Sequence, residues 1–363
     1  MALLPDADSF KRLADGTTSG PAATCLRAGL TPAAALLRGV MDLRNIAYDR
    51  GWLATHAAPV PVVCVGNLTL GGTGKTPLVA WVVRQLIAGG HRPAIVSRGY
   101  AAEPGTISDE AAELAVILPG VRHIANRDRV AGARAAAYLG ADCVVLDDGF
   151  QHRRLARDLD LVAIDATDPF GCDHVFPRGL LRERIEGLSR ADAAILTRAG
   201  MVSPERRDEI RQRFIKACGG RMPQVWAEAS HAPVAVRTGT GESMPLDWLR
   251  HRRVAAFAGI GNPSAFRDTL ERLAGEVVGF RPFPDHHAYS AADAREIADW
   301  ATHLGADALV ATLKDLVKIS PGHLPEMPLV AVEIALVVDS GEQSLSRLLR
   351  RIAPPSPDRS SCQ

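Results

Sequence analysis

The chain has 363 residues, more than one average domain, so we expect two packed units. A composition of 47% hydrophobic and 23% charged residues, with a formal net charge of +1, is typical of a globular protein. This charge balance gives no overall attraction for nucleic acid, so no nucleic-acid partner is expected. The six cysteines include no Cys-x-x-Cys pair, which argues against a zinc site or a disulfide framework and suits a reducing cytoplasm.

The pattern of the N-terminal region predicts neither a secretory signal nor a membrane span. No run of about 18 apolar residues occurs, and Asp6 and Asp8 stand where a secretory signal would be basic. Residues 1–20 are expected to form a loose leader. Thr31 and Pro32 then predict a helix start, and apolar residues as far as Ala47 cover a wide helical face. Such a helix either lies in a membrane interface with its arginines at the headgroups or packs on its own domain, and the pattern alone favours packing.

Short apolar strands alternate with helices after Pro59. The predicted strands are 60–65, 94–96, 115–117, 143–146, 161–164 and 193–196, and the predicted helices are 77–88, 109–114 and 128–139. A stretch rich in proline and glycine, 229–245, predicts a boundary. Beyond it lie predicted strands 254–259, 277–280, 308–311 and 329–334 and helices 264–273 and 291–304. Repeated β-α-β units with apolar strands predict an α/β fold whose mostly parallel sheet is covered on both faces.

A glycine-rich loop joins the first predicted strand of this series to its helix. Its sequence is Thr69-Leu70-Gly71-Gly72-Thr73-Gly74-Lys75-Thr76. Glycines let successive backbone N–H groups point at phosphate oxygens, the lysine neutralises the terminal phosphates, and Thr76 occupies one Mg²⁺ position. Thr69 replaces the usual first glycine, and the alternative is a glycine turn with an incidental Lys-Thr. The context predicts an ATP-binding phosphate loop of the P-loop NTPase type.

Two absences narrow the class of phosphate-loop protein. No Asn-Lys-x-Asp guanine-reading motif follows, which disfavours a GTPase, and Leu70 stands where partitioning ATPases carry a second lysine. We therefore expect a phosphotransferase that passes the γ-phosphoryl group of ATP to an acceptor hydroxyl.

Carboxylates follow the strand predicted at 143–146. Asp147 and Asp148 end this strand, where a metal-binding aspartate of a phosphate-loop enzyme belongs. Because adjacent strand residues point to opposite faces, one aspartate is expected to meet Mg²⁺ and the other a neighbour or the acceptor. The alternative is a plain Asp-Asp-Gly turn. Ser108, Asp109 and Glu110 open a predicted helix, and capping alone explains them.

These pieces together resemble the tetraacyldisaccharide 4′-kinase family, the lipid A 4′-kinases. The strings that carry the resemblance keep their order along the chain: Gly66-Asn67-Leu68-Thr69, the phosphate loop, Ser97-Arg98-Gly99-Tyr100, Ser108-Asp109-Glu110, Asp147-Asp148-Gly149-Phe150-Gln151-His152, Phe176-Pro177-Arg178-Gly179-Leu180-Leu181-Arg182-Glu183 and Phe283-Pro284-Asp285-His286-His287. The phosphate loop alone is generic, whereas the aspartate–glutamine–histidine string combined with the Asp-His-His string is specific.

The resemblance implies an enzyme that uses ATP and Mg²⁺ to phosphorylate the 4′-hydroxyl of a tetraacylated disaccharide 1-phosphate in lipid A biosynthesis. It implies work at the cytoplasmic face of the bacterial inner membrane, with no obligatory protein partner inferred. It further implies two α/β/α domains with the active site between them. The expected division is 1–57 for a leader and a membrane-associating helix, 58–228 for the phosphate-loop kinase domain, 229–353 for a second, smaller α/β domain and 354–363 for a disordered tail. For the N-terminal helix, the resemblance reverses the preference for packing.

Roles for single residues follow from the same resemblance. Asp109 is expected to receive the acceptor proton, with His286 as its partner and Lys75 at the phosphates. Mg²⁺ contacts are expected from Thr76, Glu110 and Asp148, and acceptor or phosphate contacts from Arg98, Tyr100, Asp147, Gln151, His152 and Arg182. The Asp-His-His string is otherwise explained by a polar loop or an unrelated metal site. Where the family commonly reads Thr-Glu-Lys-Asp, this chain has Leu313 in place of the glutamate.

Two other classes remain open on the residues alone. One is a phosphate-loop kinase of another small-molecule acceptor. The other is a nucleotide-dependent switch that hydrolyses ATP slowly and transfers nothing. Analysis of the product separates the three.

Overall fold

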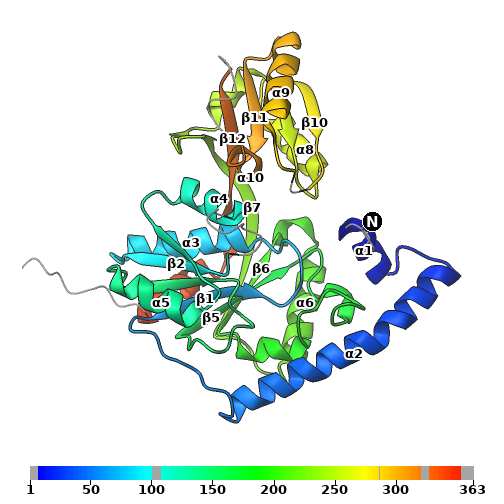
Figure 1. Ribbon diagram of the computed structural model, residues 1–363, viewed down its shortest axis with the longest axis vertical. Coiled ribbons are helices and arrows are strands. Elements are labelled where there is room, and N and C mark those ends of the chain that lie inside the picture. The colour runs from blue at the N-terminus through cyan, green and yellow to red at the C-terminus, as the bar shows by residue number, and fades with distance from the viewer. Residues whose placement is uncertain (1–6, 100–107, 286, 320–326, 353–363) are drawn as a thin grey trace, which may run out of the picture. The chain divides into compact units, whose positions relative to one another are not determined.

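The computed structural model describes residues 7–99, 108–285, 287–319 and 327–352 (Figure 1). The chain divides into two compact units. The first contains residues 1–98, 122–231 and 336–363, and the second contains residues 99–121 and 232–335. Each unit is an α/β body with its own hydrophobic core. Within the described residues, no helix combines the length and the hydropathy that a bilayer crossing requires.

Parallel strands form the sheet of the first unit, in the order β7-β6-β5-β1-β4-β2-β3. Their bounds are β1 Val62–Asn67, β2 Pro93–Ser97, β3 Arg122–Ala125, β4 Cys143–Asp147, β5 Leu159–Asp165, β6 Ala193–Thr197 and β7 Val225–Thr238. Every residue of β1, β2, β4, β5 and β6 is buried. Their near-continuous apolar sequences follow from this, because a strand covered on both faces has no solvent side.

Helices cover the sheet of the first unit on both faces. Side chains at alternate positions of β1, β2 and β4 pack on α5 (Arg129–Tyr138), and those of β5 and β6 pack on α6 (Pro204–Ala217) on the same face. The helix α3 (Lys75–Ala88) lies across the other face, against β1, β2 and β4. The C-terminal helix α11 (Glu342–Ile352) packs on α3 and buries Leu345, Leu348 and Leu349.

A long N-terminal helix, α2 (Pro21–Asp49), runs along one side of the first unit (Figure 1). It begins after Gly20 with a proline at its first position, so Pro32 lies inside the helix and the start predicted at Thr31 and Pro32 is eleven residues late. A shorter helix, α1 (Ala7–Ala14), precedes it and contacts it, where a loose leader was expected. Leu37 packs against the core that α6 covers.

The second unit contains the parallel strands β10-β9-β11-β12 in that order, and β8 pairs antiparallel with β7. The strand bounds are β8 Ser243–Met244, β9 Arg253–Ala258, β10 Glu276–Pro282, β11 Ala308–Thr312 and β12 Leu329–Ser340. Its helices are α4 Asp109–Ile117, α7 Asp247–Arg250, α8 Pro263–Leu273, α9 Ala291–His303 and α10 Leu313–Leu316. Aromatic residues Phe257, Phe283 and Tyr289 pack edge to face in its core.

The sequence predicted the class of fold correctly but not every element. Residues 115–117, predicted as a strand, complete α4, because Ala111, Leu114 and Ile117 are buried at helical spacing. Residues 229–238 of the expected boundary continue β7. The expected disorder of 354–363 concerns residues outside the described part of the chain.

Candidate active site

The glycine-rich loop connects β1 to α3 and is held by its neighbours in the first unit. The N–H of Leu70 donates to the carbonyl of Leu180 at 2.7 Å, and the N–H of Arg182 donates to the carbonyl of Leu68 at 2.8 Å. Gly74 has a φ of 75°, a left-handed conformation that favours glycine, and an added Cβ would lie 2.5 Å from the His231 ring. This glycine is therefore required both by the turn and by the space beside it.

Lys75 begins α3, and its side chain is only 14% exposed. Its Nζ donates to Oδ1 of Asn67 at 3.2 Å and lies 3.6 Å from Oδ1 of Asp148. Asn67 in turn donates through Nδ2 to the carbonyl of Thr69 at 2.7 Å, so one amide binds both the lysine and the loop backbone. Thr76, the next residue, is half-buried at the first turn of the same helix. The charge of Lys75 is thus fixed at the end of the loop.

The two aspartates after β4 do not alternate as a strand would require. Asp147 is the last residue of β4 and is buried, whereas Asp148 has left the strand with a φ of 52°. The expectation that the pair points to opposite faces of a strand is therefore wrong. The reason lies in Gly149, whose absent side chain lets the turn close against Leu146 and Cys64.

Asp148 lies between two cations. Nη1 of Arg182 donates to both of its carboxylate oxygens, at 2.9 and 2.8 Å, and Nζ of Lys75 lies 3.6 Å from Oδ1. Burial raises the pKa of Asp148, but the charges and hydrogen bonds of Lys75 and Arg182 outweigh it and hold that pKa below its ordinary value. Asp148 is accordingly ionised at neutral pH and is a suitable ligand for a divalent cation.

Gln151 and His152 follow on the same loop. Gln151 donates through Nε2 to the carbonyl of Asn67 at 2.9 Å, and Nη1 of Arg182 reaches its Oε1 at 3.5 Å. Burial, with the charges of Arg129 and other arginines, lowers the pKa of His152 to about 4, so its ring is neutral. Arg98 is exposed just after β2, and Tyr100 lies outside the described residues. The first unit therefore brings Lys75, Asp148, Gln151 and Arg182 into one connected group.

The second unit carries the other predicted residues. Ser108 caps α4 by accepting from the N–H of Ala111, which places Asp109 and Glu110 in its first turn. Nζ of Lys318 lies 3.1 Å from Oδ2 of Asp109 and 3.4 Å from the carbonyl of His287. Asp109 thus lies beside the segment that contains the Asp-His-His string, within which Asp285 accepts from Lys314 at 2.9 Å. His286 itself lies outside the described residues.

Two residues beside the loop carried no motif in the sequence. Arg198, at the end of β6 with a φ of 55°, donates through Nη2 to the carbonyl of Gly72 at 3.0 Å and forms an ion pair with Asp165. His231 packs on Gly74, and burial together with the charge of Arg198 lowers its pKa to about 4. The positive φ of Arg198 and the packing of His231 on Gly74 depend on the folded structure, so the sequence pattern predicted neither residue.

Buried polar atoms without hydrogen-bond partners around the glycine-rich loop suit the binding of a triphosphate. Among the described residues, Oγ1 of Thr73, Nε of Arg182 and Nε2 of His231 are buried side-chain atoms that have no hydrogen-bond partner. Buried polar groups without partners are costly, and a phosphate oxygen would satisfy hydroxyl and guanidinium donors. Together with the helix N-terminus and Lys75, these groups form a site suited to an anion.

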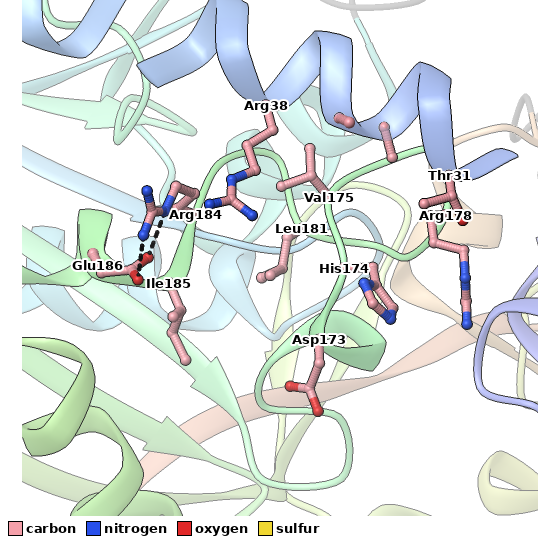
Figure 2. Close-up of a pocket in the computed structure, with 12 residues that line it drawn as sticks. Thr31, Arg38, Asp173, His174, Val175, Arg178, Leu181, Arg184, Ile185 and Glu186 are labelled. Carbon is pink, nitrogen blue, oxygen red and sulfur yellow. Dashed lines mark hydrogen bonds and ion pairs between the residues drawn. The ribbon is translucent and has the colours of Figure 1, made fainter. Parts of the chain in front are cut away.

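A separate pocket of about 310 Å³ lies in the first unit between α2 and residues 173–186 (Figure 2). Thr31 and Arg38 line it from the helix, and Arg178 and Arg184 line it from the facing segment. Arg184 is occupied by a bidentate ion pair with Glu186. The pocket mixes apolar with charged side chains.

Comparison with known proteins identifies a family. Residues 26–353 match the family described as Tetraacyldisaccharide-1-P 4′-kinase. A relative named tetraacyldisaccharide 4′-kinase from Anaeromyxobacter sp. (strain Fw109-5) is 41% identical over 352 residues, which span 92% of this chain and 94% of the relative. One of the same name from Geobacter sulfurreducens is 38% identical over 345 residues, 88% of this chain and 91% of the relative.

A solved structure matches as well. A crystal structure of an LpxK from Aquifex aeolicus in complex with ATP superposes with a TM-score of 0.72 at 30% identity, covering 90% of this chain and 99% of that chain. The similarity thus extends over both units and not only over the phosphate loop.

Proposed function

The chain belongs to the tetraacyldisaccharide-1-phosphate 4′-kinase family, and from this premise we propose the roles of its site residues and its place at the membrane. Its reaction is the transfer of a phosphoryl group to the 4′-hydroxyl of a tetraacyldisaccharide 1-phosphate in lipid A biosynthesis. The observation that supports the site assignment best is the connected group of Lys75, Asp148 and Arg182 beside the glycine-rich loop. ATP is the phosphoryl donor that we assign to it.

Residues of the first unit hold the phosphates in this proposal. The N–H groups of residues 69–76 surround the phosphates, and Lys75 and Arg182 offset the charge that spreads over the transferred group. The residues proposed to contact the acceptor or the phosphates are Arg98, Tyr100, Asp147, Gln151 and His152. Thr76 and Asp148 of this unit would hold Mg²⁺, which neutralises charge on the phosphates when it is bound. Glu110, on α4 of the second unit, is the further Mg²⁺ contact that the family resemblance assigns. Protein side chains contribute mainly position and charge, because phosphoryl transfer requires little covalent work from them.

Residues of the second unit remove the proton from the acceptor hydroxyl in this proposal. Asp109 accepts this proton, and His286 assists it. The ion pair between Asp109 and Lys318 and the contact of Lys318 with the carbonyl of His287 support the assignment, because one cation binds to both strings. The expected division, with 58–228 for phosphate binding and 229–353 for a contribution to the acceptor site, stays a proposal, and residues 99–121, which carry Asp109, join the second unit in it.

Contact with the cytoplasmic face of the inner membrane is proposed for α2. Leu36, Val40 and Leu43 recur at helical spacing and are 72%, 54% and 63% exposed, so they form an apolar stripe. An acylated substrate resides in a bilayer, and a peripheral helix of this kind brings the enzyme to it.

The proton role of Asp109 is tested by substitution in the full-length protein. Asp109→Ala should lower the turnover of labelled ATP into phosphorylated tetraacyldisaccharide 1-phosphate by ~10²-fold or more, the usual scale for a general base. Asp268→Ala, an exposed aspartate on α8 of the same unit, is the control and should retain activity. An unchanged rate for Asp109→Ala would leave this residue only its place in the first turn of α4.

Product analysis of the same reaction separates the classes of function. The expected product carries the label in its 4′-phosphate. Label recovered only as inorganic phosphate would indicate a nucleotide-dependent switch, and label on a soluble acceptor alone would indicate another kinase.

A further inference from the structure

A chain of hydrogen bonds joins the N-terminal helix α2 to the lysine of the phosphate loop. Its centre is Glu183, a carboxylate that is 1% exposed. Glu183 accepts from Nδ2 of Asn45 on α2 at 2.7 Å, from Nη2 of Arg190 at 2.7 Å and from Nε2 of Gln151 at 3.2 Å. A buried carboxylate requires such donors, so its position is set by all three.

The chain continues from Gln151 to the loop. Nε2 of Gln151 also donates to the carbonyl of Asn67 at 2.9 Å, and Oδ1 of Asn67 accepts from Nζ of Lys75 at 3.2 Å. The path from Asn45 to Lys75 therefore passes through Glu183, Gln151 and Asn67, and at Asn67 it enters through the main-chain carbonyl and leaves through the side-chain amide. Each of its steps is a direct contact in the first unit.

Further contacts hold the same part of α2 in place. Arg44 donates through Nη2 to the carbonyl of Gln151 at 2.8 Å. Arg153 donates to the carbonyl of Asn45 at 3.0 Å and to Asp49 at 2.6 Å. The segment 151–153 is thus fixed to α2 on both its main chain and its side chains.

The space around Glu183 is shaped for this network. A Cβ on Gly187 would lie 3.0 Å from Oε2 of Glu183, the oxygen that accepts from Asn45, and 3.0 Å from Nη1 of Arg190. Any larger residue at 187 would displace the carboxylate or its partners. Asn45 lies about half a helical turn away from the exposed stripe of Leu36, Val40 and Leu43, so the helix presents apolar side chains outward and the amide that enters the network inward.

We propose that α2 sets the position of Lys75 through Asn45, Glu183, Gln151 and Asn67, which makes Asn45 a positioning residue for phosphoryl transfer. The proposal rests on the role of Lys75 proposed above. Lys75 must lie at the transferring phosphates, and a displacement of about 1 Å can lower a rate by ~10²-fold. A defect at Asn45 should therefore appear in kcat and not in the binding of ATP or of the membrane.

The test uses Asn45→Asp in the full-length protein. Aspartate has the shape of asparagine, but it places a second carboxylate against Glu183 and removes the donor. We expect kcat to fall at least tenfold, more than for Asn45→Ala, with the KM for ATP and sedimentation with anionic vesicles within about twofold of the unchanged protein. If Asn45 served only to pack α2, the isosteric aspartate would be the milder of the two changes.

A compensating pair completes the design. In Asn45→Asp with Glu183→Gln, the new amide can donate to the aspartate while its oxygen still accepts from Gln151 and Arg190, so kcat should recover most of the loss. Thr31→Ala is the matched control, because Oγ1 of Thr31 donates only within α2, to the carbonyl of Arg27. Thermal melting of each variant identifies the folded proteins, and Asn45→Ala carries the kcat comparison if the aspartate variant does not fold.

The outcomes separate the two proposals. A double variant no better than Asn45→Asp, or an Asn45→Ala enzyme with normal kcat, would overturn the positioning role. Failure of the unchanged protein to phosphorylate the lipid would instead overturn the proposed function itself. A loss of vesicle binding that accounts for the whole loss of activity would make α2 an anchor only.

Discussion

Two groups hold the ammonium group of Lys75, a neutral amide and an ionised carboxylate. Asn67 accepts one of its hydrogen bonds, and Asp148 supplies the opposite charge at 3.6 Å. Arg182 in turn binds both oxygens of Asp148. The arrangement keeps the ammonium group in position before any phosphate arrives, which is the condition for electrostatic stabilisation without reorganisation.

Lys75→Ala should reduce phosphoryl transfer by ~10²-fold or more, because it removes a charge that is fixed at the phosphates. The fold should persist, since Lys75 belongs to neither core cluster of the first unit. Rate and melting temperature are measured together, with Lys216→Ala on α6 as an exposed control in the same unit. Near-normal turnover of Lys75→Ala would refute the phosphate-loop assignment.

The residues of the site divide by how far their partners lie in the sequence. Lys75 and Asp148 were found from local strings because a phosphate loop and a strand-end carboxylate have short signatures. The contacts of Asn45 with Glu183 and of Thr197 with Thr73 join residues more than 100 positions apart, so no local pattern indicates them. The left-handed turn at Asp148 was likewise missed, because it depends on how Gly149 packs against Cys64.

Helix α2 combines two faces with different tasks. Leu37 packs on the core of the first unit and Asn45 enters the network at Glu183, whereas Leu36, Val40 and Leu43 are exposed. An exposed apolar stripe on a helix that is otherwise tied to the protein is the arrangement that an interfacial helix requires.

Replacing Leu36 and Leu43 by glutamate should weaken sedimentation with anionic vesicles at least tenfold, because burial of each leucine is worth roughly 1.5–3 kcal/mol. Tyr138→Glu on α5 is the control, since this side chain is 91% exposed but lies outside α2. Binding that is unchanged in the double variant would place the membrane contact elsewhere.

Elements that are buried on both sides were the easiest to predict. The strands β1, β4 and β6 have continuous apolar sequences, and their positions agree with prediction to within two residues. The helix α6 was missed because charged residues occupy most of its positions and only Ile210 and Phe214 are buried. The early start of α2 was missed because Pro32 indicated a helix start, whereas Pro21 supplies one eleven residues earlier.

Histidines make the stability of the first unit sensitive to acid. Burial lowers the pKa of His123, His152 and His231 from 6.5 to about 4 in each case. The unfolded chain therefore binds protons between these two values that the folded unit does not bind. Each neutral histidine therefore contributes to the free energy of unfolding in full above pH 6.5. This contribution declines as the pH falls toward 4, by up to about 1.4 kcal/mol per pH unit for each histidine.

Urea denaturation between pH 7.5 and 5 measures this slope. The free energy of unfolding should fall with decreasing pH, and it should fall less steeply in His123→Gln, which removes one of the three groups. Parallel curves for the two proteins would mean that His123 titrates normally in the fold.

The last helix is part of the first unit although the second unit precedes it in the sequence. Leu345, Leu348 and Leu349 of α11 are buried, and Ser346 donates to Gln85 of α3 at 3.3 Å. Deleting residues 342–363 should cost at least several kcal/mol, since each leucine contributes roughly 1.5–3 kcal/mol. That loss is comparable with the whole stability of an ordinary domain, so a lower melting temperature or insoluble protein is expected. A truncated protein that melts normally would contradict this.

The chain passes between its two units four times, at residues 98/99, 121/122, 231/232 and 335/336. Neither unit is therefore a contiguous product of translation. While a ribosome is making the protein, the phosphate-loop unit has its strands early but lacks residues 336–352 until nearly the whole chain has emerged. A nascent chain in that state leaves one side of α3 uncovered, so we expect the apolar surface there to be a binding site for chaperones during synthesis.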